Sequence, residues 1–172
     1  MKSIHALHVY VNVLTFSMKN NIKRPKLISV FGGREANNQA LKNAELLGKA
    51  IAEHNWVLLC GGRGGIMEAV SKGCHEAGGI VIGIMPGIDD SDANPYVTIP
   101  IATGIGLARN EILASACDVA VAISGKYGTL SEIGHALQYN KSVISLGSWG
   151  IDGMIKAETV DEVIGTLKKL LK

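Results

Sequence analysis

The sequence predicts an α/β fold, a Rossmann-like three-layer αβα arrangement with a mainly parallel, doubly wound sheet. Short apolar runs such as residues 56–60 are typical of strands buried on both faces. These runs alternate with amphipathic segments, which indicates repeated strand–helix units. Glycine-rich breaks follow three of the strands, and 21 of the 172 residues are glycine, well above the average of about 7%.

The first half of the fold opens with a strand at residues 27–31 and a helix whose apolar residues recur every three or four positions. That helical face consists of Ala40, Ala44, Leu47 and Ile51. A buried strand at 56–60 comes next, and a helix at 66–77 ends at a pair of glycines. The apolar run at 80–84 predicts the third strand, which a polar loop at 86–96 follows.

In the second half, a short strand is expected at 97–101 and a helix at 105–117. Leu107, Ile112 and Leu113 are the expected inward positions of that helix. The remaining strands and helices are expected, in alternation, at 119–123, 129–139, 142–146 and 159–171.

Residues 26–172 are interpreted as a single Rossmann-like nucleotide-binding domain and residues 1–25 as an N-terminal extension. Alternating valines at residues 9–13 favour an additional edge strand within that extension. No apolar run reaches the roughly 18 residues of a membrane span. The net charge of +2 argues against a nucleic-acid partner.

The three cysteines show no spacing typical of metal ligands, so no metal site is expected. Their apolar surroundings favour reduced, buried thiols and a cytoplasmic location.

Two glycine-rich turns lie between a buried strand and a helix, where unpaired helix N–H groups attract phosphate. The first turn contains Gly61, Gly62, Arg63, Gly64, Gly65, Ile66 and Met67. The second turn contains Ser124, Gly125, Lys126, Tyr127, Gly128 and Thr129. Gly32 and Gly33 form a third break. Neither turn has the GxGxxG spacing or the P-loop Lys-Ser/Thr pair, which argues against a dinucleotide fingerprint and an ordinary NTPase. The alternative for each is a tight turn without a ligand.

Two charged residues are candidates for chemistry. Arg109 lies early in an otherwise apolar helix, where a cation opposes the helix dipole. Glu132 lies near the start of the next helix, close to the second glycine turn. The alternative is that both lie on the surface, with Arg109 paired to Glu111 or Asp118.

The segments CGGRGGIMEAV, GGIVIGIMPG, LARN and SGKYGTLSE resemble the Lonely Guy (LOG) superfamily over residues 26–146. The resemblance implies a Rossmann-like homodimer or homotetramer. It also implies hydrolysis of the N-glycosidic bond of a nucleoside 5′-monophosphate to free base and ribose 5-phosphate, with no required cofactor. Arg109 and Glu132 correspond to the catalytic pair, and the glycine turns with Asn110 correspond to the nucleotide-binding residues.

The superfamily was formerly described as lysine decarboxylases, and that chemistry is rejected here. It requires pyridoxal phosphate bound to a lysine in a dedicated site. Lys126 is the only lysine in a glycine turn, and nothing else in the sequence favours this cofactor.

Several residues depart from the hydrolase pattern. Ser124 and Lys126 replace a proline and a glycine, Leu107 stands in place of a histidine, and Asn110 replaces a lysine. These departures resemble a neighbouring branch that includes the molybdenum-cofactor carrier protein. The branch implies a non-catalytic carrier of a phosphorylated pterin, with the molybdenum cofactor as cargo. A nucleotide sensor is the further alternative, and the sequence leaves hydrolase, carrier and sensor open.

Overall fold

Seven parallel strands form one sheet in the order β4-β3-β2-β1-β5-β6-β7. The structure is a computed structural model that describes residues 24–172, so the edge strand expected at residues 9–13 lies outside the described residues. The strands are β1 (Leu27–Gly32), β2 (Val57–Cys60), β3 (Val81–Met85), β4 (Ile99–Ala102), β5 (Val119–Ile123), β6 (Ser142–Leu146) and β7 (Ile155–Ala157). The expected α/β class with a parallel sheet is confirmed.

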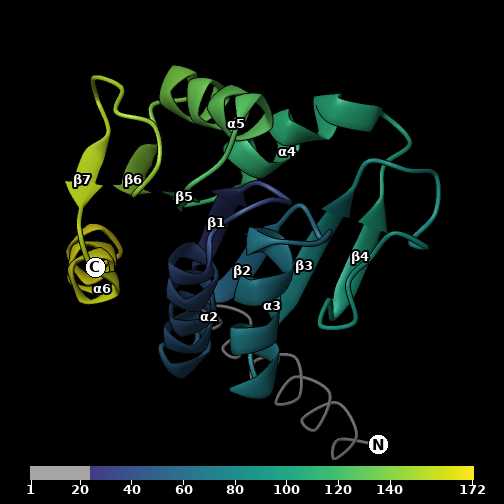
Figure 1. Ribbon diagram of the computed structural model, residues 1–172, viewed down its shortest axis with the longest axis horizontal. Coiled ribbons are helices and arrows are strands. Elements are labelled where there is room, and N and C mark those ends of the chain that lie inside the picture. Colours follow the sequence, from purple (N-terminus) through teal and green to yellow (C-terminus); the bar gives the residue numbers. More distant parts are fainter. Residues whose placement is uncertain (1–23) are drawn as a thin grey trace, which may run out of the picture.

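Helices cover both faces of the sheet and make three layers (Figure 1). One face carries α2 (Asn38–Glu53), α3 (Ile66–Glu76) and α6 (Val160–Leu170). The opposite face carries α4 (Arg109–Ala116), which follows the short helix η1 (Gly106–Ala108), and α5 (Tyr127–Gln138). Right-handed crossovers produce this division, because strands β2 to β4 are added on one side of β1 and strands β5 to β7 on the other.

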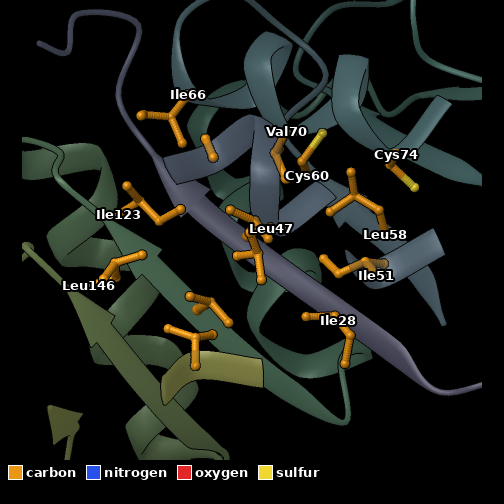
Figure 2. Packing of buried hydrophobic residues seen from close by; sticks show 14 of the residues in the cluster. Ile28, Leu47, Ile51, Leu58, Cys60, Ile66, Val70, Cys74, Ile123 and Leu146 are labelled. Carbon is orange, nitrogen blue, oxygen red and sulfur yellow. The ribbon is translucent and has the colours of Figure 1, made fainter. Parts of the chain in front are cut away.

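Each strand contributes alternate residues to two separate cores. In β5, Val119, Val121 and Ile123 pack toward α2, α3 and α6, and Figure 2 shows this larger core. Ala120 and Ala122 face α4 and α5 instead. Because both faces of the strand are covered, all five residues are buried, which explains the continuous apolar run in the sequence.

Two expectations about local structure are wrong. The helix expected at 105–117 is divided into η1 and α4, and Leu107 is 74% exposed instead of facing inward. The glycine at position 106 adopts a positive φ of 61°, which interrupts regular helix before α4 begins. The three-residue strand β7 was not expected at all, because so short a segment shows no measurable periodicity.

The three cysteines, Cys60, Cys74 and Cys117, are free and buried, as the sequence predicts. Burial raises the pKa of each thiol, that of Cys74 to about 12. Among residues 24–172, no helix has both the length and the apolar character needed to cross a membrane.

Helices α2 and α3 touch backbone to backbone through two glycines. A Cβ atom on Gly73 would overlap the carbonyl of Glu45, and one on Gly48 would overlap the carbonyl of Val70. This contact fixes α3 against α2 and therefore positions the turn between β2 and α3, which forms one wall of the site described below.

Replacing Gly73 by alanine is expected to lower the free energy of unfolding by about 1–3 kcal/mol, because the added methyl group forces the two helices apart. Gly134→Ala is the matched control: Gly134 is also helical and has open space around its Cα, so its substitution should be stabilising by roughly 0.5–1 kcal/mol. Urea denaturation measures both values. Equal effects of the two substitutions would contradict the proposed close contact.

Candidate functional site

A cleft of about 250 Å³ opens at the carboxyl ends of the central strands. It lies between β1 and β5, where the order of the strands in the sheet reverses. The connections that follow these two strands lead to opposite faces of the sheet. Such a reversal is the usual ligand site of an open parallel sheet. The residues that line it are Gly32, Gly33, Arg34, Glu35, Arg63, Met67, Leu107, Arg109, Asn110, Lys126, Gly128, Thr129 and Glu132.

The first glycine turn forms part of the cleft wall, and one of its N–H groups is already used within the fold. The backbone N–H of Ile66 donates to the carbonyl of Gly33 at 3.0 Å, so the first donor of α3 is already used. Gly62 and Gly65 adopt positive φ angles of 68° and 72° that turn the chain into the helix. Of the residues expected in this turn, those that line the cleft are Arg63 and Met67.

Gly61 lacks a side chain for a steric reason and not because of its φ angle. A Cβ atom at this position would overlap the guanidinium nitrogens of Arg109 and the sulfur of Met67. The space that an ordinary residue would fill at the end of β2 is therefore occupied by the charged end of a side chain from α4. Gly64 has open surroundings, with the Glu68 carboxylate as its nearest neighbour.

Arg109 is the first residue of α4 and is only 6% exposed. Its Nε and Nη1 atoms are buried and have no hydrogen-bond partner. Within residues 24–172 no carboxylate forms an ion pair with it, which excludes the expected alternative pairing with Glu111 or Asp118. Burial lowers the pKa of its guanidinium, but an arginine remains charged at neutral pH. A buried, unpaired cation is costly, and an anion entering the cleft would compensate it.

Glu132 lies in the second turn of α5 and is 6% exposed. Burial raises the pKa of its carboxyl group to about 8, against the opposing influence of the Arg109 charge. At neutral pH the group is therefore mainly protonated, so it can both donate and accept hydrogen bonds. The two residues expected as a catalytic pair thus line one cleft, although they form no ion pair with each other.

Asn110 fastens α4 to the start of α5. Its Nδ2 atom donates to Oγ of Ser131 at 2.9 Å and to the carbonyl of Gly128 at 3.4 Å. Asn110 therefore fixes the position of α5 relative to Arg109, the residue that precedes Asn110 in α4. This positioning role differs from the ligand contact expected from the sequence, although the residue also lines the cleft.

The second glycine turn leaves the N-terminus of α5 open to the cleft. Gly128 and Thr129 line the cleft, and the first N–H groups of a helix have no partner within it. Lys126 occupies the capping position but makes no side-chain capping bond. Gly125 has a φ of 103°, and a Cβ atom there would overlap Thr129. Ser124 and Tyr127 lie outside the cleft lining.

Two of the cations that line the cleft already form exposed ion pairs. Lys126 pairs with Glu35 at 2.7 Å, linking the β1–α2 and β5–α5 connections. Arg63 pairs with Asp92 of the acidic loop, also at 2.7 Å. Arg109 therefore differs from both of these rim cations in having no acidic partner.

Sequence reasoning missed Arg34, Glu35 and Leu107 as cleft residues. The first two follow the Gly32-Gly33 break directly, so their place after a strand was an available signal. The only signal for Leu107 was that it stands in place of a histidine of the hydrolase pattern, and its exposure results from the interrupted helix. Within the described part of the chain, no group of three His, Cys, Asp or Glu residues is arranged to hold a metal ion.

A model of the SLOG cluster4 family matches residues 25–170 of the chain. The chain belongs to this family. Its fold is similar to that of the molybdenum cofactor binding protein from Rippkaea orientalis, with 36% identity and a TM-score of 0.83 over 87% of this chain and 99% of that one. The molybdenum cofactor carrier protein from Chlamydomonas reinhardtii is 37% identical, with a TM-score of 0.80 over 86% of this chain and 99% of that one.

The hydrolase branch is also represented among relatives of this SLOG cluster4 protein. A cytokinin riboside 5′-monophosphate phosphoribohydrolase from Mycobacterium marinum is 28% identical over 130 residues, which cover 67% of each protein. The resemblance to the LOG superfamily is therefore confirmed, and the solved structures extend the likeness over nearly the whole chain of the cofactor-binding relatives.

The raised pKa of Glu132 makes stability depend on pH. The folded chain keeps this proton up to about pH 8, whereas an unfolded chain releases it near the ordinary value of 4.5. The folded state thus binds more protons between these values, and the free energy of unfolding should fall as the pH rises through this interval. Glu132→Gln removes this contribution, so the stability of the wild type relative to the variant is expected to decrease with rising pH.

Urea denaturation of both proteins across this interval measures the difference. Glu53→Gln, at an exposed position of α2, is the control and should show a nearly constant difference from the wild type. A constant difference for Glu132→Gln as well would contradict the raised pKa.

Proposed function

We propose that the cleft binds a small phosphorylated heterocycle and that the protein is a carrier of the phosphorylated pterin of the molybdenum cofactor. The observation that carries the proposal is the guanidinium of Arg109, which is buried without a hydrogen-bond partner on two of its nitrogens. A phosphate group supplies several acceptor oxygens and the missing negative charge.

The phosphate would lie between Arg109 and the N-terminus of α5. Gly128 and Thr129 bring the first turn of α5 to the cleft, and the positive end of the helix dipole favours an anion there. The absence of a Cβ atom on Gly128 allows close approach of the phosphate to the backbone. Lys126 and Arg63 already have acidic partners. Arg109, which is buried, and Arg34, which is exposed, are the two other cations that line the cleft and could contact the ligand.

The protonation of Glu132 supports binding more than glycosidic hydrolysis. Hydrolysis passes through a positively charged, oxocarbenium-like transition state, which an ionised carboxylate stabilises. With a pKa of about 8, the carboxyl group is mainly neutral and suits hydrogen bonding to the edge of a heterocycle. The likeness to cofactor-binding proteins along almost their full length supports the same choice.

A nucleoside 5′-monophosphate phosphoribohydrolase is the second candidate. The presence of Arg109 and Glu132 in one cleft favours it, as does the similarity to the mycobacterial hydrolase. Glu132 would have to ionise to stabilise the developing positive charge and to orient water. The rate of such a reaction would therefore increase as the pH approaches 8, the pKa of this group.

The carrier proposal predicts that pterin co-purifies with the protein from a host that makes the molybdenum cofactor. Arg109→Met should reduce the retained pterin about 10- to 100-fold, the effect of losing charge-assisted hydrogen bonds. It should leave stability unchanged or higher, because an uncompensated buried charge is removed. Oxidised-pterin fluorescence measures the cargo, and thermal denaturation measures stability.

Arg24→Met is the control, since Arg24 lies outside the cleft and pairs with Asp118. Its pterin content should equal that of the wild type. Wild-type protein without pterin, or equal retention by Arg109→Met, would overturn the carrier proposal.

The two candidate functions differ in whether the protein hydrolyses nucleoside 5′-monophosphates. We expect a panel of nucleoside 5′-monophosphates to bind without release of ribose 5-phosphate. Release that increases toward pH 8 and falls about 100-fold or more in Glu132→Gln would instead establish the phosphoribohydrolase. A colorimetric assay for reducing sugar, with ribose 5-phosphate as standard, measures the reaction.

A further inference from the structure

Two aromatic side chains lie together beside the N-terminus of α5. Tyr127 is 81% exposed and Trp149 is 36% exposed. Their ring centroids are 6.4 Å apart and their planes are inclined by 33°. Large aromatic side chains usually bury much of their surface, so an exposed pair next to a ligand cleft presents an unused surface for contact.

The backbone holds this pair at the cleft rim. Tyr127 is the first residue of α5 and lies between Lys126 and Gly128, which both line the cleft. Trp149 belongs to the connection between β6 and β7, which is fastened to the second glycine turn. In that connection, Oγ of Ser148 donates to the carbonyl of Ser124 at 2.6 Å.

Trp149 limits the positions that the Tyr127 ring can adopt. Its own carbonyl accepts a hydrogen bond from Oγ of Ser145 at 3.2 Å, which ties the loop back to the buried strand β6. A side chain whose position is restricted before binding loses less conformational entropy when a ligand arrives. The pair is therefore a preorganised surface with one largely exposed ring.

The cleft is small enough that part of a phosphorylated heterocycle can extend beyond it. At about 250 Å³, the cleft is smaller than the roughly 300–1,000 Å³ of most small-molecule sites. A phosphate at the N-terminus of α5 lies within a side chain's length of the Tyr127 backbone. A flat ring joined to that phosphate can then extend over the rim, where stacking on an aromatic face is favourable.

We propose that the exposed face of Tyr127, held in place by Trp149, is the stacking surface for the planar ring of the ligand. This inference rests on the proposed function, because the phosphate site anchors the other end of the same ligand. Pterins and guanine share a flat, amino- and oxo-substituted ring that such a surface could recognise. Leu107 on another part of the rim is apolar but has no aromatic face.

The test compares two phosphate esters that differ in having a ring. Guanosine 5′-monophosphate carries a planar heterocycle similar to a pterin, whereas ribose 5-phosphate has none. Calorimetric titration should show that Tyr127→Ala weakens the first ligand about 5- to 150-fold, the range for loss of base–aromatic stacking. Affinity for ribose 5-phosphate should be unchanged, and Tyr127→Phe should bind both ligands as the wild type does.

Tyr139→Ala is the matched control, because Tyr139 is a partly exposed tyrosine that directly follows the other end of the same helix. It should change neither affinity. An independent readout uses Trp56→Phe, which leaves Trp149 as the sole tryptophan. The fluorescence emission of Trp149 should be quenched by guanosine 5′-monophosphate and not by ribose 5-phosphate.

Two results would overturn the proposal that Tyr127 is the stacking surface, and the two can be distinguished from each other. If Tyr127→Ala leaves the affinity for guanosine 5′-monophosphate unchanged, or weakens both ligands equally, the ring lies elsewhere while the phosphate site stands. If neither ligand binds the wild type, the proposed function fails together with the inference. Trp149→Leu, titrated in the same way, should lower affinity for the ring-bearing ligand alone.

Discussion

The guanidinium of Arg109 is buried and forms no ion pair with a carboxylate of residues 24–172, and several features of the cleft accommodate it. Gly61 lacks a side chain where the guanidinium lies. Asn110 fastens the start of α4 to α5. The rim carboxylates pair with Arg63 and Lys126 and leave Arg109 without a partner. An uncompensated buried charge destabilises a fold, so its presence is best explained by a ligand that supplies the opposite charge.

The position of this charge follows from the sheet topology. Because the order of strands reverses between β1 and β5, their connections diverge to opposite faces and leave a crevice at their carboxyl ends. Helices α4 and α5 lie together on one face, which brings Arg109 and the first turn of α5 to the same crevice. On the opposite face, the turn before α3 forms one wall of the cleft. Helix α3 packs closely on α2 through glycines.

Arg109 and Glu132 illustrate how one pair of residues fits two functions. Together they resemble the pair that a glycosidic hydrolase would use. Burial, however, raises the pKa of Glu132 to about 8, which favours the neutral acid at neutral pH. A neutral hydrogen-bonding group beside a lone cation is well suited to holding an anionic heterocycle without reacting with it. The two proposed functions would therefore require different protonation states of this carboxyl group.

The sheet and the general location of the cleft were predictable from the sequence. Strands buried on both faces require continuous apolar runs, as in β5. Helices that pack on a sheet with one face require apolar residues at helical spacing. Both patterns are visible in the sequence. Which side chains contact one another depends on how distant segments pack in three dimensions. Local patterns do not encode the lack of an ion pair on Arg109 or the use of the Ile66 N–H by Gly33, because these depend on contacts between segments distant in sequence. The exposure of Leu107 depends on a local helix break.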